Sequence, residues 1–206
     1  MKDLLIIGAG GHGRVVADIA GRTGRYGSVA FLDDMPPKAG FGYAWLGKTD
    51  RAGELLDRYE LFVAIGNGAV RRRLMEELTA QGAVFATLTA PEAVIAGDVK
   101  IGEGSVVMPG AVINTGTMIG RGVIVNTASS VDHDCCVADY CHVAVGARLC
   151  GTVHVGEQTW IGAGATIINN ITVCPGCMIG AGAVVVKQIT QAGTYLGVPA
   201  KRVNGK

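Results

Sequence analysis

A six-residue repeat occupies the second half of the chain. From Ile95 to Val185, each of the sixteen residues spaced six apart is Ile, Val or Leu. The residues four positions after each of these, from Val99 to Ile189, are all small or apolar. A helix repeats every 3.6 residues and a strand every two, so neither has this period. Six-residue repeats are typical of a parallel β-helix, in which three short faces close one triangular coil.

The repeat also predicts how the prism is filled and where it turns. The aliphatic column should fill the interior, and the column of small residues should fit beside it. The position directly after the aliphatic residue is often Gly, Asn or Asp, as at Gly102, Asn114, Gly120, Asn126, Asp132, Gly156, Gly162 and Gly180. Because these residue types tolerate unusual backbone angles, we expect this position to form the corner.

The N-terminal part of the chain has a different pattern. The segment "DLLIIGAGGHGRVVADIAGRTG" predicts a strand, a glycine turn and a helix, with Gly8, Gly10 and Gly13 spaced as G-x-G-x-x-G. The segments "SVAFLDD", "LFVAIGN" and "AVFATL" predict further strands, and "AVRRRLMEELTAQ" predicts a helix. Alternating strands and helices form a parallel sheet. The predicted fold is therefore a short Rossmann-like α/β domain in residues 1–88 and a parallel β-helix in residues 89–206.

The glycine turn indicates nucleotide binding. Backbone N–H groups at the start of a helix can hold phosphates, and Asp33 has the spacing of an acid that bonds a ribose hydroxyl. The predicted sheet is only half of a dinucleotide-binding fold, and His12 lies inside the motif. These features favour a mononucleotide or nucleotide-sugar over NAD. A packing turn in a small α/β domain is the alternative.

Charge and composition exclude several partners. The net charge is +1, which gives no broad attraction to nucleic acid or to an anionic membrane. No apolar run approaches the ~18 residues of a transmembrane helix, so we expect a cytoplasmic protein whose six cysteines are thiols. Cys174 and Cys177 form C-x-x-C without the second pair that a zinc site requires, so no metal is expected.

Four motifs, in order, resemble one family. They are "IIGAGGHGRVVAD", "FLDD", "AIGN" and "VNTASSVDHDCCVADYCHVAVGA". The chain resembles sugar O-acyltransferases of the sialic acid O-acetyltransferase type, which include bacterial nucleotide-sugar N-acetyltransferases. It is most similar to the UDP-4-amino-sugar enzymes that make N,N′-diacetylbacillosamine precursors. The resemblance implies a left-handed β-helix, acetyl-CoA as co-substrate, and a homotrimer with sites between subunits.

The same resemblance implies roles for individual residues. His133 would be the general base, with Asp134 raising its basicity, and His142 would lie by the acetyl-CoA thioester. Coil stacking together with the resemblance adds Gly151, Ala163 and Ala181 to the acetyl-CoA site. The nucleotide-sugar would be bound by the N-terminal domain through Gly10, Gly11, His12, Asp33, Asp34 and Gly66.

Part of this chemistry follows from the residues alone. Transfer from acetyl-CoA to an amine needs one base with a pKa near 7, which suits histidine, and one donor for the thioester oxygen. His133 has a hexad position outside the core, and we expect Asp134 and Asn126 to accompany it. An exposed surface histidine is the alternative for His133.

Other polar residues of the repeat have simpler interpretations. Trp160 follows His142 by eighteen residues and should lie on the same face, although His142 could also be a surface histidine. We expect His154 to be solvated. Cys135, Cys141 and Cys177 occupy the column of small residues and should be core thiols.

Four other functions remain open at this point. The first is O-acetylation of sialic acid or another sugar hydroxyl. The second is a carbonic anhydrase with zinc on His133, His142 and His154. The third is an NAD-dependent oxidoreductase, and the fourth is a noncatalytic scaffold or sugar sensor.

Overall fold

A computed structural model describes residues 2–203, and the chain divides into two compact units, Met1–Pro91 and Glu92–Lys206. The sequence predicts a boundary at residue 88, whereas the structure divides after Pro91. No helix among the described residues is long and apolar enough to cross a membrane.

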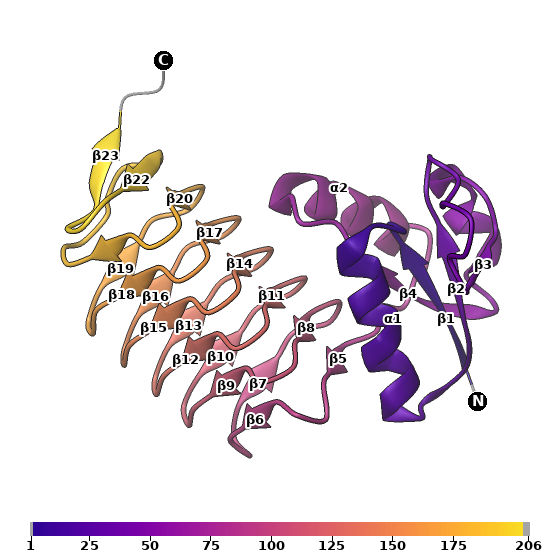
Figure 1. The fold of residues 1–206 in the computed structure, drawn as a ribbon, viewed down its shortest axis with the longest axis horizontal. Helices are drawn as coiled ribbons and strands as arrows, with labels where there is room; N and C mark the ends of the chain where they lie inside the picture. Colours follow the sequence, from indigo (N-terminus) through magenta and orange to yellow (C-terminus); the bar gives the residue numbers. More distant parts are fainter. Residues whose placement is uncertain (1, 204–206) are drawn as a thin grey trace. The chain divides into compact units, whose positions relative to one another are not determined.

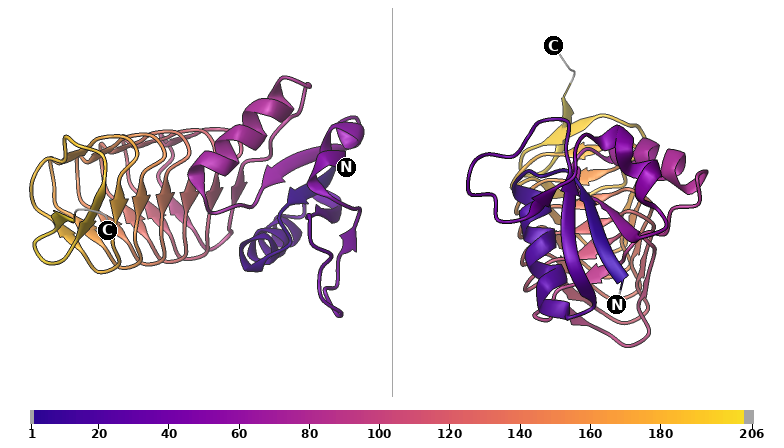
Figure 2. Two further views of the ribbon diagram at one scale, coloured as in Figure 1. Left: turned by 90° about the horizontal axis from the view of Figure 1, so that it is seen from above. Right: turned by 90° about the vertical axis from the view of Figure 1, so that its right-hand side faces the viewer.

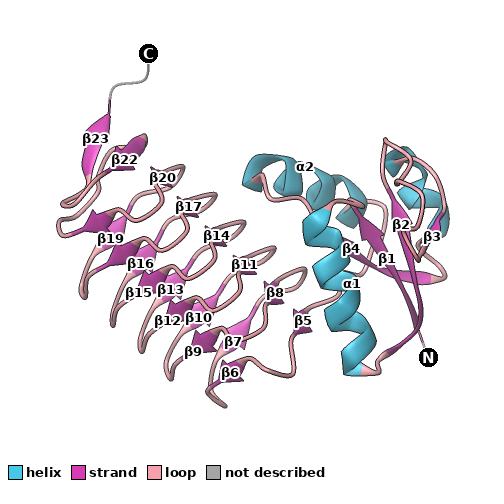
Figure 3. Cartoon of the chain, viewed as in Figure 1, coloured by secondary structure: helices cyan, strands magenta, loops and turns pink. Residues whose placement is uncertain are grey.

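The first unit is built on a parallel sheet with the strand order β3-β2-β1-β4 (Figure 1). Its strands are β1 (Lys2–Ile7), β2 (Tyr26–Leu32), β3 (Ala44–Trp45) and β4 (Tyr59–Val63), and β5 (Leu88–Thr89) follows later in the chain. Its helices are α1 (Gly11–Thr23), the short 3-10 helix η1 (Thr49–Leu55) and α2 (Gly68–Thr79). Figure 3 shows the helices of the described chain gathered in this unit.

The structure corrects three details of this unit. The segment 83–88 is no continuous strand, because Phe85 forms only an isolated bridge to Leu61 of β4 and regular strand structure begins at Leu88, in β5. The structure adds β3 and η1, which the sequence pattern did not predict. Val15 of α1 is 40% exposed, so the apolar side of this helix consists of Val16, Ile19 and Ala20 without it.

The second unit is a prism with three faces of two-residue strands (Figures 1 and 2). The β7 face contains β7 (Lys100–Ile101), β10 (Met118–Ile119), β13 (Cys136–Val137), β16 (His154–Val155) and β19 (Thr172–Val173). The β8 face contains β8 (Val106–Val107), β11 (Ile124–Val125), β14 (His142–Val143), β17 (Trp160–Ile161) and β20 (Met178–Ile179), then β22 (Thr194–Leu196) and β23 (Lys201–Val203). The β6 face contains β6 (Val94–Ile95), β9 (Val112–Ile113), β12 (Ser130–Val131), β15 (Arg148–Leu149), β18 (Thr166–Ile167) and β21 (Val184–Val185).

Each coil of the prism is eighteen residues long. Successive strands of a face pair in parallel and in register, as Ile124 does with His142 and His142 with Trp160. Three parallel sheets of such short strands are typical of a left-handed β-helix; the repeat predicted the parallel β-helix, and the family resemblance implied its left hand.

The interior of the prism is filled by the two predicted columns, which are buried through most of its length. Polar side chains in the small column bond the backbone, mostly that of the next coil. The Thr117 hydroxyl donates to the Asp132 carbonyl at 2.7 Å and accepts from the Cys135 N–H at 3.2 Å. The prediction that Cys135, Cys141 and Cys177 are core thiols is confirmed. Burial of these hydroxyls and thiols therefore destabilises the fold little, because each has a hydrogen-bond partner.

The corners are formed differently from the prediction. From Ile101 to Ile179, the residue with positive φ is the third after each core aliphatic, and six of these residues are not glycine: Ala128, Asp134, Tyr140, Thr152, Gln158 and Asn170. The first residue after the aliphatic has an ordinary φ. Glycine occurs there because a Cβ would strike the next coil, as at Gly156, where it would approach the Cys174 carbonyl carbon to 2.8 Å. Close stacking of the coils, rather than an unusual backbone angle, therefore explains these glycines.

Candidate active site

His133 and Asp134 form a hydrogen-bonded pair at the corner between β12 and β13. The His133 Nδ1 lies 2.8 Å from Asp134 Oδ2. An ionised carboxylate can only accept, so Nδ1 carries the proton and the outer nitrogen, Nε2, is left with a lone pair. The His133 side chain is 53% exposed, so a substrate can reach it. The pair has the geometry of a general base with an orienting acid.

The backbone of this corner is held by neighbouring polar groups. Asp132 Oδ1 accepts from the His133 N–H at 2.8 Å and from Asn114 Nδ2 at 2.7 Å. Asp134 has a φ of 56° and donates its N–H to the Thr115 carbonyl at 3.0 Å. Aspartate tolerates this left-handed conformation better than most residues. The fold therefore sets the direction of both side chains of the pair.

The acids at this corner change the titration of the histidine. The hydrogen bond from Nδ1 to Asp134 raises the pKa of His133, although partial desolvation acts against it. The negative charge of Asp132 also raises this pKa, and the pKa of Asp132 is itself lowered by the bonds from Asn114 and the His133 N–H. An imidazole of raised pKa is a stronger base once it is neutral.

Two glycines make room for the pair. Gly151 lies one coil after His133, and a Cβ on it would overlap the imidazole at Nε2 and lie 2.6 Å from Cε1. Gly116 lies one coil before Asp134, and a Cβ on it would overlap Oδ1 of that carboxylate. Any side chain at residue 151 would therefore displace the imidazole.

His142 lies in a different environment. It is buried on the β8 face, with its ring centroid 4.2 Å from that of Trp160 and its Nε2 3.0 Å from Asn126 Nδ2. The predicted neighbourhood of His142 and Trp160 is confirmed, and His142 is not the exposed surface histidine of the alternative interpretation. The expected pairing of Asn126 with His133 is wrong, because this amide bonds His142 instead.

One chain does not bring the predicted transferase residues together. Around one coil the chain passes β11, corner 126–128, β12, corner 132–134, β13, corner 138–140 and β14. His133 therefore occupies the corner opposite the β8 face, which carries His142. Gly151 stacks on the His133 corner, whereas Ala163 and Ala181 stack at the corner between the β8 and β6 faces.

The three prism histidines do not form a common site. His154 is exposed on the β7 face, as predicted, where it pairs with Cys136 one coil after the His133 corner, whereas His142 lies on the β8 face. Among residues 2–203, no three His, Cys, Asp or Glu side chains are grouped so that they could hold a metal ion.

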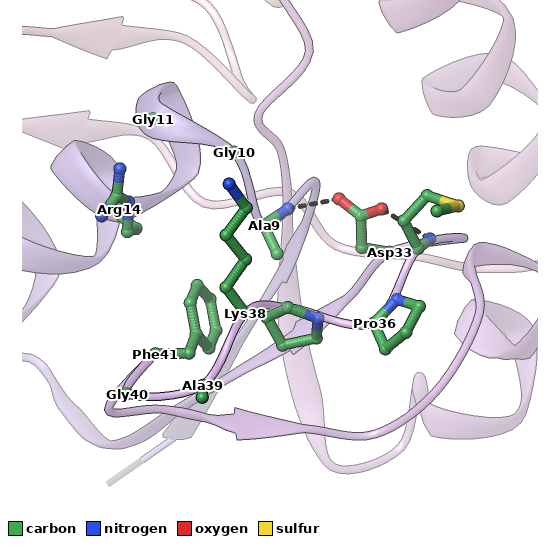
Figure 4. A pocket seen from close by; sticks show the side chains of 12 residues that line it. Ala9, Gly10, Gly11, Arg14, Asp33, Pro36, Lys38, Ala39, Gly40 and Phe41 are labelled. Atoms are coloured by element: carbon green, nitrogen blue, oxygen red, sulfur yellow. Dashed lines mark hydrogen bonds between the residues drawn. The ribbon is translucent and has the colours of Figure 1, made fainter.

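The first unit has a pocket of about 380 Å³ at the glycine turn. Its lining is Ala9, Gly10, Gly11, Arg14, Asp33, Met35, Pro36, Pro37, Lys38, Ala39, Gly40 and Phe41. Figure 4 shows the Lys38 side chain extended toward the turn at Ala9 and Gly10, with the Phe41 ring beside it. The pocket combines backbone N–H groups at a helix start, two cations, an acid and an aromatic ring, which suits a phosphorylated ligand.

The glycines of the motif have separate roles. Gly8 has a φ of 109°, and a Cβ on Gly13 would overlap the Gly8 carbonyl oxygen, so both are required by the fold. A Cβ on Gly10 or Gly11 would meet no atom within 4 Å. Glycine at these two positions therefore leaves space in the pocket itself, where a ligand can approach the backbone.

The two predicted acids are bound by the protein backbone. Asp33 lines the pocket, and its carboxylate accepts from the Ala9 N–H at 2.7 Å and the Met35 N–H at 2.9 Å. Each oxygen retains capacity for a ribose hydroxyl. Asp34 does not line the pocket, because it accepts from the Thr49 N–H at 3.1 Å and hydroxyl at 2.6 Å.

Gly66 and His12 also lie outside the lining of the pocket. The carbonyl of Gly66 accepts from the buried Arg71 guanidinium at 3.0 Å. Burial and the nearby charge of Arg71 lower the pKa of His12 to about 4, so this imidazole is neutral near pH 7. Its Nε2 is buried without a hydrogen-bond partner among the described residues.

Sequence reasoning missed the two cations of the pocket. Most cations of the first unit are paired with carboxylates: Lys2, Arg22, Arg25, Arg51, Arg58, Arg72 and Arg73. Within residues 2–203, the side chains of Arg14 and Lys38 have no such partner. Arg14 stands directly after the glycine motif and could have been suspected, whereas Lys38 lies on an irregular loop without a recognisable spacing.

Family models match both units of the chain. The model described as the PglD N-terminal domain matches residues 3–78. The model described as bacterial transferase hexapeptide, with six repeats, matches residues 152–187. The two matches fall on the pocket unit and on the prism.

Individual proteins are similar over different lengths. UDP-N-acetylbacillosamine N-acetyltransferase of Bacillus subtilis is 33% identical over 112 residues, which span 52% of this chain and 52% of that protein. The chain thus matches about half the length of that relative. The acetyltransferase domain of PglB from Neisseria gonorrhoeae, solved with acetyl coenzyme A, is 41% identical with a TM-score of 0.94, covering 98% of this chain and 99% of that one. A mutant perosamine N-acetyltransferase from Caulobacter crescentus, solved with CoA and GDP-perosamine, is 34% identical with a TM-score of 0.94, covering 100% and 98%.

Proposed function

The chain belongs to the PglD-type hexapeptide-repeat sugar N-acetyltransferases, and we propose that it transfers the acetyl group of acetyl-CoA to the amino group of a nucleotide-linked sugar. The substrate that we favour is a UDP-linked 4-amino-4,6-dideoxy sugar. The observation that carries the proposal is the exposed His133–Asp134 pair, which supplies the one base that such a transfer needs. Purified protein should release CoA thiol only when acetyl-CoA and the correct amino sugar are both present. UDP- and GDP-linked 4-amino sugars, tested side by side, would identify the nucleotide.

The proposed mechanism is direct transfer. The neutral imidazole of His133 takes a proton from the amine at Nε2 as the nitrogen attacks the thioester carbon, and Asp134 stabilises the resulting imidazolium through Nδ1. The Gly151 N–H has no acceptor among the described residues, and Gly151 packs against the imidazole. This N–H is therefore a suitable donor for the thioester oxygen as negative charge develops there. The transfer needs no covalent intermediate with the protein, because the thioester is already activated.

The Asp134→Asn variant should move the pH profile. His133 must be neutral to accept a proton, so turnover rises as the pH rises through its pKa. Since Asp134 raises this pKa, the acidic limb of the wild-type profile should lie above that of an ordinary histidine, about 6.5. Asparagine tolerates the positive φ but carries no charge, so the acidic limb should shift to lower pH and the plateau should fall. If the acidic limb of a plot of kcat against pH lies at the same pH in Asp134→Asn and the wild type, the proposed role of Asp134 is contradicted.

We also propose that the acetyl-transfer site forms between two subunits of a trimer. His133 and His142 lie on opposite sides of one prism, so a molecule that contacts both would take them from different chains. Chains carrying His133→Ala or His142→Ala, unfolded and refolded together, test this. Each site would take His133 from one subunit and His142 from its neighbour. After random mixing of the two variants, each of these histidines is intact at about half of the sites, so about a quarter of the sites have both. The mixture should therefore recover activity that neither variant has alone, and no recovery despite mixed assembly would contradict the proposal.

The nucleotide is proposed to occupy the pocket at Gly10 and Gly11, with its diphosphate near Lys38 and Arg14. Lys38→Met should raise KM for the nucleotide-sugar about 10- to 100-fold, the weight of one charge-assisted hydrogen bond. KM for acetyl-CoA should stay constant. Lys48→Met is the matched control, because Lys48 is a lysine of the same unit outside the pocket lining. Equal effects of the two substitutions would remove Lys38 from the site.

A further inference from the structure

Cys174 and Cys177 are two free thiols that face each other across one corner of the prism. Their Sγ atoms are 3.6 Å apart. The residues between them, Pro175 and Gly176, are the central residues of a turn, and Gly176 has a φ of 71°. The first and last Cα atoms of a β-turn lie within about 7 Å, and disulfides usually join Cα atoms about 4.4–6.8 Å apart. The backbone therefore already has a spacing that a disulfide can bridge.

Cys177 Sγ donates to the Gln191 carbonyl at 3.8 Å, and the other core thiols make the same kind of contact without a second thiol beside them. Cys135 and Cys141 direct their Sγ atoms to carbonyl oxygens of the next coil, at 3.2 Å from Cys150 and 3.1 Å from Gly156. At the corner of Cys174, the two preceding coils have Ala138 and Gly156 in its place. Among the described cysteines, a contact between two Sγ atoms is found only for Cys174 and Cys177. This pairing is thus a feature of one coil and not a consequence of the repeat.

We propose that Cys174 and Cys177 are a redox modification site, at which a small-molecule disulfide such as oxidised glutathione converts the two thiols to an intramolecular disulfide. The Cys174 thiolate first attacks the oxidant, forming a mixed disulfide and releasing one glutathione thiolate. Cys177 then loses its proton, attacks Sγ of Cys174 and releases the second glutathione. Two protein thiols are oxidised, and the oxidant is reduced to two thiols.

The surroundings determine the order of these steps. Cys174 is partly exposed, whereas Cys177 is buried, so the oxidant meets Cys174 first. Burial, together with the contact to Cys174, raises the pKa of Cys177 to about 12, despite the nearby charge of Arg202, which acts in the opposite direction. A thiol of such high pKa is a poor first nucleophile. It can still act as the second, because its target sulfur is in contact with it and needs no diffusion.

The test is thiol mapping of the whole wild-type protein. The protein is equilibrated with reduced and oxidised glutathione at graded ratios, its free thiols are alkylated, and its peptides are analysed by mass spectrometry. As the ratio becomes oxidising, Cys174 and Cys177 should lose alkylation together, and their peptide should lose two hydrogens. The proposal is overturned if both stay alkylated at every ratio, or if the reaction stops at a glutathione adduct on Cys174.

Three variants complete the test. Cys177→Ser should stop at the glutathione adduct on Cys174, and Cys174→Ser should abolish the reaction at this corner. Cys136→Ser, which removes a half-buried thiol elsewhere on the prism, should form the same disulfide as the wild type. Disulfide formation that persists in Cys174→Ser would overturn the assignment. Because the readout is alkylation rather than acetyl transfer, the result is independent of the proposed catalytic activity.

Discussion

His133→Ala should lower turnover about 10²- to 10⁴-fold, the usual contribution of a general base. The affinity for acetyl-CoA should be almost unchanged, because the buried His142 and Trp160 lie on a different side of the prism from this corner. The measurements are acetyl-CoA-dependent thiol release and calorimetric titration with acetyl-CoA. His154→Ala is the control, since His154 is also an exposed histidine on the prism but lies on the β7 face.

A second readout separates a base from a residue that only shapes the corner. The His133 side chain is 53% exposed, so its removal leaves a space that opens to solvent. Added imidazole should therefore enter this space and restore part of the turnover of His133→Ala, and should have no effect on the wild type. If the turnover of His133→Ala stays within a few-fold of that of the wild type, His133 is not the base. A large loss without imidazole rescue, and with weakened acetyl-CoA binding, would indicate a structural role.

The prism could be predicted because one interaction pattern is repeated in every coil. Each aliphatic residue faces the interior, and each small residue beside it either packs or bonds the next coil, as Thr117 and Cys135 do. A pattern that recurs without insertion leaves few alternative folds. The outward position of His133 and the inward positions of Cys135 and Cys141 follow directly from their places in the hexad.

The details of the corners could not be predicted as well from the sequence, because they depend on contacts between coils. Gly156 and Gly151 look alike in the sequence, yet one avoids the backbone of the next coil and the other avoids the imidazole of His133. Likewise, Asn126 lies in the hexad before that of His133 but bonds His142, since it directly follows β11, whose Ile124 pairs with His142. Hexad spacing describes the columns but not which side chains meet across a corner.

The pocket at the glycine turn was predicted through its glycines and Asp33, but its cations were not. Arg14 lies on a helix and Lys38 on the loop after β2, so the fold of the first unit brings them together. Loops of this kind follow no period, and the short strand β3 that anchors the end of this loop has only two residues. What identifies both residues is their place in the lining of the pocket, together with the lack of a carboxylate partner within residues 2–203, and this becomes visible only with the coordinates.

Gly151→Ala should also cause a large loss of turnover, on the order of 10²-fold, the effect expected when a catalytic group is displaced by about 1 Å. The added methyl group would overlap the His133 ring at Nε2, and the exposed ring can move away from it. Gly97→Ala is a closely matched control. Gly97 has the same hexad position in the same corner column, and a Cβ on it would meet nothing within 4 Å. Thermal unfolding should be similar for both variants, and turnover should fall only in Gly151→Ala.

A double variant distinguishes displacement of the base from a lost contact with acetyl-CoA. If the methyl group added at residue 151 acts only by moving His133, then Gly151→Ala should not lower turnover any further in a chain that already carries His133→Ala. Effects that act through one group are not additive, whereas independent effects multiply in turnover. A second loss of similar size in the double variant would show that residue 151 acts on acetyl-CoA or the thioester oxygen by itself. Equal turnover of His133→Ala with and without the second substitution would establish Gly151 as a positioning residue for the base.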